Sequence, residues 1–361
     1  MEQINSFGDR AGHPQMTGEE RLDAFKRVIA HPHLIAAGRT LREAIREPGG
    51  ALLIFVCGPA GVGKTTLKKY ALEWDRERAP ILSLVAKPPL NGSFSWTEFL
   101  QCGISTLQQP LIDRKDTGNF DNDKENTKLA QVRGSQSGSG SLKRVRDDDL
   151  RISLETAIDR HFPAAVIIDD AQYLGRVSGK RQMRDQLDCL KSMAEATETV
   201  HVLIGSYELF NLYDVCMQST ARSFFVHFPR YGSTDEELSR FKNVLRTLQQ
   251  FLPFEEETDL LLKHWEFCYE RSLGCVGILH FMLARAVCAA LRAEERKLGR
   301  AYLERYALSE AECYVMMRQI YGAERDLACR SAPTELRQLL GLAPHIAFGS
   351  EISGNFSEKD A

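Results

Sequence analysis

The sequence has no Cys-x-x-Cys pair, although nine of its 361 residues are cysteine. The odd number leaves at least one cysteine without a partner in the chain, and no cysteine pair has a histidine at zinc-ligand spacing. The pattern therefore argues against a disulfide framework and against a structural zinc site. We expect reduced, mostly buried thiols and a cytoplasmic protein.

Long apolar runs are also missing. No segment reaches eighteen uninterrupted apolar residues, and the opening stretch MEQINSFGDRAGHPQ has no basic region that leads into an apolar one. These absences predict no export signal and no membrane span. A large excess of positive charge is missing too, because the formal net charge is −3. Contact with nucleic acid would therefore need a local basic patch.

Apolar runs and helical patterns alternate along the first two thirds of the chain. Continuous apolar runs predict buried strands at 51–58, 80–87, 164–170, 200–206 and 223–228. Helical spacing of apolar residues predicts helices at 64–78, 96–111, 150–161 and 181–197. The alternation predicts an α/β domain over 51–232, built on a parallel five-stranded sheet sandwiched by helices.

The rest of the chain lacks this alternation. Residues 1–50 predict an N-terminal helical segment, interrupted at Pro32. Residues 113–147 are polar, contain a Gly/Ser tract and predict a disordered insertion within the α/β domain. Residues 233–343 carry only helical patterns and predict a smaller all-helical lid domain, and 344–361 predict a flexible tail.

The stretch GPAGVGKTT matches the phosphate-loop pattern G-x-x-x-x-G-K-[ST]. Its glycines allow backbone N–H groups to converge on phosphate oxygens, the lysine neutralises the β- and γ-phosphates, and the following threonine can bind Mg²⁺. The next helix points its positive dipole end at the same anion. We expect ATP and Mg²⁺ as cofactors, held by Gly58, Pro59, Ala60, Gly61, Val62, Gly63, Lys64, Thr65 and Thr66. Lys68 and Lys69, one turn along, are expected on the solvated face of the helix.

Three further positions are candidates for nucleotide chemistry. In AVIIDDAQYL, we expect Asp169 to hold Mg²⁺ and Asp170 to orient or deprotonate the attacking water; the alternative is a solvated strand end. Ser206, after the fourth strand, would meet the γ-phosphate or its water, unless it is only part of a turn. Arg222 would offer a guanidinium to the nucleotide of a neighbouring subunit, unless it is an ordinary surface arginine.

Together, the phosphate loop, the acid pair, the polar end of the fourth strand, the arginine and the helical domain resemble an AAA+ ATPase. The segment RLDAFKRVIAHPHLIAAGRTLREAI and the phrases IDDAQYL, IGSYELFNL, FVHFPRY and SLGCVGIL resemble the TnsC and TniB class of transposition regulators of Tn7-like elements. The resemblance covers residues 18–340 without the insertion. It implies that Lys64, Thr65, Asp169 and Asp170 carry nucleotide chemistry, that Ser206 is a sensor, and that Arg222 acts in trans.

The same resemblance implies partners. Proteins of this class bind ATP, assemble as rings or filaments on duplex DNA, and link a target selector of the TniQ or TnsD kind to a transposase. Two departures limit the comparison. Asp170 stands where many members have Glu, so hydrolysis would be slow and regulatory. The stretch GCVGILHF places no arginine at the usual second sensor, and neither Arg271 nor Arg285 fills that position by spacing.

Basic residues after the second and third strands are candidates for DNA contact. In ring ATPases these segments face the central channel, and clustered cations neutralise backbone phosphates without reading sequence. The alternative is a solvated basic helix face. The candidate residues are Lys87, Arg176, Lys180, Arg181 and Arg184.

Three functions remain open from the sequence. The main hypothesis is an ATP-switched assembly on DNA in which hydrolysis controls disassembly. A replication-loading or signalling ATPase would use the same core with a different partner. A small-molecule kinase shares the phosphate loop, but the helical carboxyl-terminal domain and the missing lid arginines speak against it.

Overall fold

The computed structural model describes residues 25, 30–73, 80–89, 92–108, 146–177, 179–219, 222–254, 259–330 and 340–341. The chain divides into two compact units, Met1–Ser309 and Glu310–Ala361. The predicted tail 344–361 lies outside the described residues, as does the predicted insertion except for its last two positions. The predicted domain boundaries at 50, 232 and 343 stay predictions.

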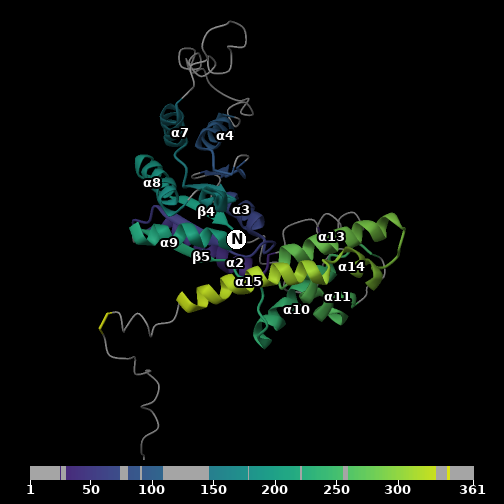
Figure 1. The fold of residues 1–361 in the computed structure, drawn as a ribbon. Coiled ribbons are helices and arrows are strands. Elements are labelled where there is room, and N and C mark those ends of the chain that lie inside the picture. The colour runs from purple at the N-terminus through teal and green to yellow at the C-terminus, as the bar shows by residue number, and fades with distance from the viewer. Residues whose placement is uncertain are drawn as a thin grey trace, which may run out of the picture. The chain divides into compact units, whose positions relative to one another are not determined.

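A parallel five-stranded sheet forms the centre of the first unit (Figure 1). The strands are β1 (Leu53–Cys57), β2 (Ile81–Val85), β3 (Ala165–Asp169), β4 (His201–Gly205) and β5 (Ser223–His227). Their order across the sheet is β2-β3-β4-β1-β5. All five predicted strands are confirmed. Because β1, β3 and β4 lie inside the sheet, their apolar runs are buried on both faces, as in parallel sheets generally.

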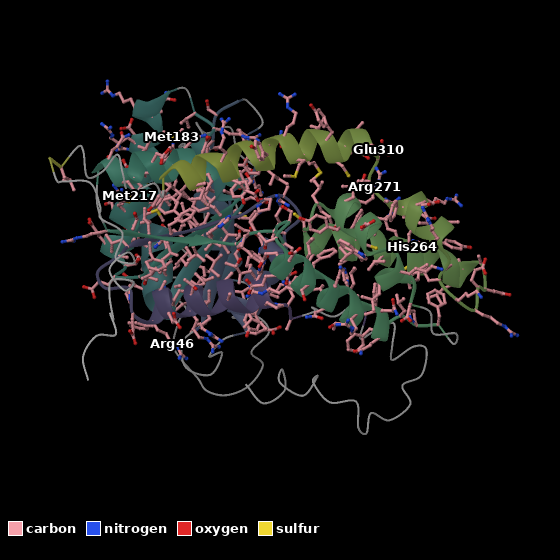
Figure 2. All side chains as sticks on the ribbon, turned by 90° about the horizontal axis from the view of Figure 1, so that it is seen from below. Arg46, Met183, Met217, His264, Arg271 and Glu310 are labelled. Atoms are coloured by element: carbon pink, nitrogen blue, oxygen red, sulfur yellow. The ribbon has the colours of Figure 1, made fainter. Side chains whose placement is uncertain are left out.

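Helices cover both faces of this sheet. On one face, α2 (Pro32–Arg46) and α3 (Lys64–Leu72) share a core with Ile54, Val56 and Val202. On the other face, α9 (Phe210–Ser219) places Tyr213 edge-on against Phe55, and α9 packs against α8 (Lys180–Ala196). In Figure 2, Arg46 at the end of α2 and Met183 of α8 lie on opposite sides of the sheet. The predicted sandwich of helices around the sheet is confirmed.

Helix α4 (Trp96–Gln108) packs against the edge strand β2, and α7 (Asp147–His161) packs against α4. The sequence explains the ends of α7. Asp147, Asp148 and Asp149 occupy its first turn, and Arg160 and His161 its last, so both ends complement the helix dipole.

Downstream of β5 the first unit is helical in its described residues. It contains α10 (Asp235–Gln250), α11 (Leu260–Lys263), α12 (Trp265–Ser272), α13 (Val276–Arg292) and α14 (Arg300–Tyr306). Thr234 caps α10 by accepting a hydrogen bond from the Glu237 N–H at 3.4 Å. A second hydrophobic core, which includes Phe241, Leu279 and Leu283, holds these helices together. The predicted helical character is confirmed for these described residues.

The second unit contains one described helix, α15 (Glu310–Arg330). No single helix among the described residues is both long and apolar enough to cross a membrane; α12 and α13 reach that length only as a pair bent by 114°. The eight cysteines whose side chains are described form no disulfides, and five of them are buried. Reduced, mostly buried thiols were the expectation for these positions.

Candidate functional site

The carboxyl ends of three adjacent strands bring the predicted site residues to one edge of the sheet. The phosphate loop follows β1, Asp169 ends β3, and Ser206 follows β4. Since β4 lies between β3 and β1, its end sits between the acid pair and the loop. The crevice outside the carboxyl ends of parallel strands is where such sheets bind ligands.

The phosphate loop has the backbone that an anion site needs. Gly61 and Gly63 have φ angles of 77° and 115°, in the left-handed region that favours glycine. Helix α3 then begins at Lys64 with Gly63 as its N-cap, and no side chain caps it. The N–H groups of its first turn are therefore available to phosphate oxygens.

The side chain of Lys64 is held by backbone carbonyls of the phosphate loop. Its Nζ donates hydrogen bonds to the carbonyl oxygens of Gly58 at 3.0 Å and Pro59 at 2.7 Å. Burial lowers the pKa of Lys64 to about 8, against the opposing effect of Cys275, Cys57, Asp170 and Asp169. A phosphate group would restore the charge balance around this ammonium, because an anion nearby favours the charged form.

Asp169, the first acid of the pair, forms an ion pair with Lys68. Asp169 Oδ2 accepts a short hydrogen bond from Lys68 Nζ, and both side chains are about 15% exposed (15% and 14%). The prediction that Lys68 lies on the solvated face of α3 is wrong, because one helical turn carries it under the end of β3. Lys69 is exposed, as predicted. Lys68 supplies the compensating cation that a half-buried carboxylate requires.

The donors at this edge fit a magnesium ion. Thr65 offers a hydroxyl and Asp169 a carboxylate, both hard oxygen ligands. The Lys68 ammonium on Asp169 Oδ2 shows that this carboxylate already attracts a cation. Among the described residues no group of three or more His, Cys, Asp or Glu side chains could hold a metal alone. Magnesium would therefore arrive with the phosphates, which complete its ligand set.

Asp170 and Ser206 are joined through a residue that the sequence did not nominate. Asp170 has a left-handed backbone (φ 53°) and caps the short helix η1 (Ala171–Gly175). Gln172 Nε2 donates to Asp170 Oδ1 at 3.2 Å, and Gln172 Oε1 accepts from the backbone N–H of Ser206, also at 3.2 Å. The sequence signal that could have nominated Gln172 is its amide, two residues after the acid pair. The structure thus brings Asp170 and Ser206 into one hydrogen-bonded group.

The helical part meets the phosphate loop at the start of α13. The backbone N–H of Ile278 donates to the Gly61 carbonyl at 3.1 Å, and a Cβ on Gly277 would lie 2.4 Å from that same oxygen. Backbone atoms make this contact, and the stretch GCVGILHF that forms it contains no arginine. Arg271 pairs with Glu270 at 3.6 Å, and Arg285 lies 5.5 Å from the centre of the Phe281 ring and 5.1 Å from that of Tyr306. The second sensor arginine stays unassigned.

Arg222 lies at the opposite edge of the sheet. It directly precedes β5, and its carbonyl accepts a hydrogen bond from the Leu52 N–H at 3.3 Å, next to the start of β1. The phosphate loop follows the other end of β1. Arg222 is therefore not part of the site of its own chain, and its role toward a neighbouring subunit stays a prediction.

The candidate DNA contacts have mixed surroundings. Lys87 pairs with Glu98 at 3.2 Å. Arg176 pairs with Glu208 at 3.6 Å and lies 4.6 Å from the centre of the Tyr173 ring. On α8, Arg181 and Arg184 are exposed, as are Gln182, Asp185 and Asp188, and the side chain of Lys180 lies outside the described residues. DNA contact stays a prediction for all five residues.

Comparison with protein families gives a match over part of the chain. Residues 46–213 match the family model described as an AAA domain. The matched range contains Lys64, Asp169, Asp170, Gln172 and Ser206, and it supports an AAA+ ATPase. The five-stranded parallel sheet with its covering helices is an α/β AAA+ fold. The comparison with curated protein sequences gave no match.

Several solved structures align with most of the chain. The Aeropyrum pernix ORC2 protein, solved as ADPNP and ADP complexes, is 15% identical, with 81% of this chain and 71% of that chain covered and a TM-score of 0.48. A Walker-type ATPase of Pyrococcus abyssi is 18% identical (82% and 75% covered, TM-score 0.44). Domain III of the Thermotoga maritima replication initiation protein DnaA is 12% identical (82% and 95% covered, TM-score 0.41).

Proposed function

We propose that this chain is an AAA+ ATPase that uses the binding and hydrolysis of ATP as a switch. The observation that carries the proposal is the backbone hydrogen bond from Ile278 to Gly61, which docks α13 on the phosphate loop. A nucleotide binds to the N–H groups of that loop, so its arrival changes the surface against which α13 packs. The helical part therefore responds to the nucleotide at the sheet edge.

Each site residue has a role in hydrolysis. Lys64 neutralises the β- and γ-phosphates, and Ser206 meets the γ-phosphate or its water. Asp170 orients the water and accepts its proton as the water oxygen bonds to the γ-phosphorus. The bond from that phosphorus to the β,γ-bridging oxygen then breaks, which leaves ADP and inorganic phosphate. Thr65 and Asp169 would hold Mg²⁺, which would supply further charge neutralisation.

The site favours slow turnover. Asp170 is one methylene shorter than the glutamate of many AAA+ members, and it is fixed in a left-handed backbone. The carboxylate therefore reaches less far toward a water beside the γ-phosphate. Slow hydrolysis suits a timer, in which the ATP state persists long enough to recruit a partner.

The proposed output is an assembly on duplex DNA that regulates transposition. Its support is the sequence resemblance to the TnsC and TniB class, together with the exposed Arg181 and Arg184 on α8. In this proposal ATP-bound subunits form a homo-oligomeric ring or filament, Arg222 of each subunit faces the nucleotide of its neighbour, and the assembly links a target selector to a transposase.

Electron microscopy of the full chain tests this proposal. We expect rings or filaments on duplex DNA with a non-hydrolysable ATP analogue and none with ADP. Lys64→Ala removes the cation that holds the phosphates and prevents assembly. Asp170→Asn preserves assembly and blocks the disassembly that follows ATP addition. A chain that stays monomeric and transfers phosphate to a small molecule would contradict the proposal.

The DNA contact has its own test. Arg181→Ala with Arg184→Ala should weaken binding to unrelated DNA sequences alike and reduce the salt dependence, by about one unit of slope per lost phosphate contact. Arg146→Ala, an exposed arginine at the start of α7, is the matched control. An unchanged salt slope in the double variant would exclude this face as the DNA contact.

A further inference from the structure

Gln172 uses both ends of its amide to join residues from two strands. Its Nε2 donates to Asp170 Oδ1, after β3, and its Oε1 accepts from the backbone N–H of Ser206, after β4, each at 3.2 Å. An amide is the only side-chain group of this shape that donates at one end and accepts at the other. A glutamate could keep the bond from Ser206 but would place a second negative charge beside Asp170.

The neighbouring strand end leaves space for this amide. A Cβ on Gly205, the last residue of β4, would lie 2.6 Å from Gln172 Oε1 and 3.2 Å from Gln172 N. The conformation of Gly205 is ordinary, so the requirement is one of space. Any larger residue at this position would push the Gln172 side chain away from the Ser206 N–H. The bridge therefore depends on the close approach of two backbones.

The Asp170 carboxylate has few other restraints. Its backbone is fixed, because its N–H donates to Asp169 Oδ1 at 3.0 Å and its φ is left-handed. Its side chain is exposed, and the hydrogen bond that the structure gives its carboxylate comes from Gln172. Without that bond the carboxylate would be free to rotate into solvent, away from a water placed at the sheet edge.

We propose that Gln172 is a positioning residue for ATP hydrolysis. Its amide fixes the Asp170 carboxylate in the orientation that accepts a proton from the attacking water, and it holds that carboxylate in register with Ser206. Gln172 itself neither gives nor takes a proton. This inference rests on the proposed function above, since it assigns a role within the same site.

Three variants of Gln172 distinguish the contributions of the two ends of its amide. Gln172→Glu keeps the acceptor for Ser206 and adds a charge beside Asp170. Gln172→Leu removes both hydrogen bonds without adding charge, and Gln172→Asn keeps the amide but shortens its reach by one methylene. Gln101→Glu, at an exposed position on α4, controls for the added charge. Each full-length variant is assayed for ATP affinity with a fluorescent ATP analogue, for kcat and KM, and for the pH dependence of kcat.

We expect kcat to fall about ten- to a hundredfold in all three Gln172 variants, because a misplaced base loses part of its catalytic effect. ATP affinity and KM should change less than about threefold, since Gln172 does not line the phosphate loop. In Gln172→Glu alone the acid limb of the pH profile should move to higher pH, because the new carboxylate disfavours the deprotonated form of Asp170. Gln101→Glu should match the wild type.

Each other outcome is decisive. Wild-type kcat in the Leu and Asn variants would overturn the inference. Parallel losses of ATP affinity and kcat, with one pH profile shared by all variants, would assign Gln172 a structural role only. A chain that binds ATP but hydrolyses none at any pH would also overturn it and leave nucleotide binding intact. Failure of the proposed function looks different: Lys64→Ala would then bind ATP as well as the wild type.

Discussion

The sheet edge and the helical part place different kinds of groups around the phosphate loop. The sheet edge contributes a lysine on the loop carbonyls, an acid paired with Lys68, and an amide between Asp170 and Ser206. The helical part contributes a backbone N–H and the close approach of Gly277. Charged groups at one side can bind and cleave a nucleotide, whereas the backbone contact at the other side can only follow the shape of the loop.

Raising the pH removes the positive charge of Lys64 at the sheet edge. Of the changes considered, this one has the largest expected effect. The pKa of Lys64 is lowered to about 8, so the free chain loses this positive charge above pH 8. ATP affinity should be constant below that pH and fall up to about tenfold per pH unit above it, because binding requires the protonated form. Titration of a fluorescent ATP analogue between pH 6.5 and 9.5 measures this.

Lys64→Arg is the control for the pH experiment, because arginine keeps its charge throughout this range. Its ATP affinity is expected to be lower than that of the wild type but flat with pH. A wild-type ATP affinity that stays flat up to pH 9.5 would contradict this prediction. It would show that Lys64 keeps its proton, because the neighbouring acidic groups offset the effect of burial on its pKa.

Gly277→Ala tests the backbone contact between α13 and the phosphate loop. The added Cβ would lie 2.4 Å from the Gly61 carbonyl, so α13 must move away from the loop, at a cost of about 1–3 kcal/mol of unfolding free energy. Chemical denaturation measures this loss. Gly322→Ala is the matched control: it is also in a helix, has nothing within 4 Å, and should gain about 0.5–1 kcal/mol from helix propensity. Equal effects of the two changes would argue against a tight contact at Gly277.

Lys68→Met tests the ion pair with Asp169 at the sheet edge and has the smallest expected effect. It leaves Asp169 without its cation, at a cost of about 1 kcal/mol to the nucleotide-free chain, because the pair is still partly in contact with solvent. Mg²⁺ with ATP replaces the lost charge. The gain in melting temperature on adding Mg·ATP should therefore exceed that of the wild type. Lys69→Met, on the exposed side of α3, should change neither value.

The elements that follow from local sequence were predictable, and the pairings between them were not. The run before Gly58 is apolar throughout, and the loop glycines stand at fixed spacing, so strand, loop and helix could all be inferred. Lys68 and Asp169 are 101 residues apart, and Gln172 and Ser206 are 34 apart. Nothing in a single sequence links such positions. Only the strand order, which places β4 beside β3, brings Gln172 to Ser206.

Hydrogen exchange at the backbone amide of Ile278 tests the central claim most directly, because this N–H donates to the phosphate loop. Exchange is measured with and without Mg·ATP, in the wild type and in Lys64→Ala. We expect ATP to change the protection of this amide and of the first turn of α13 in the wild type but not in Lys64→Ala. Unchanged exchange in a wild-type chain saturated with ATP would contradict it.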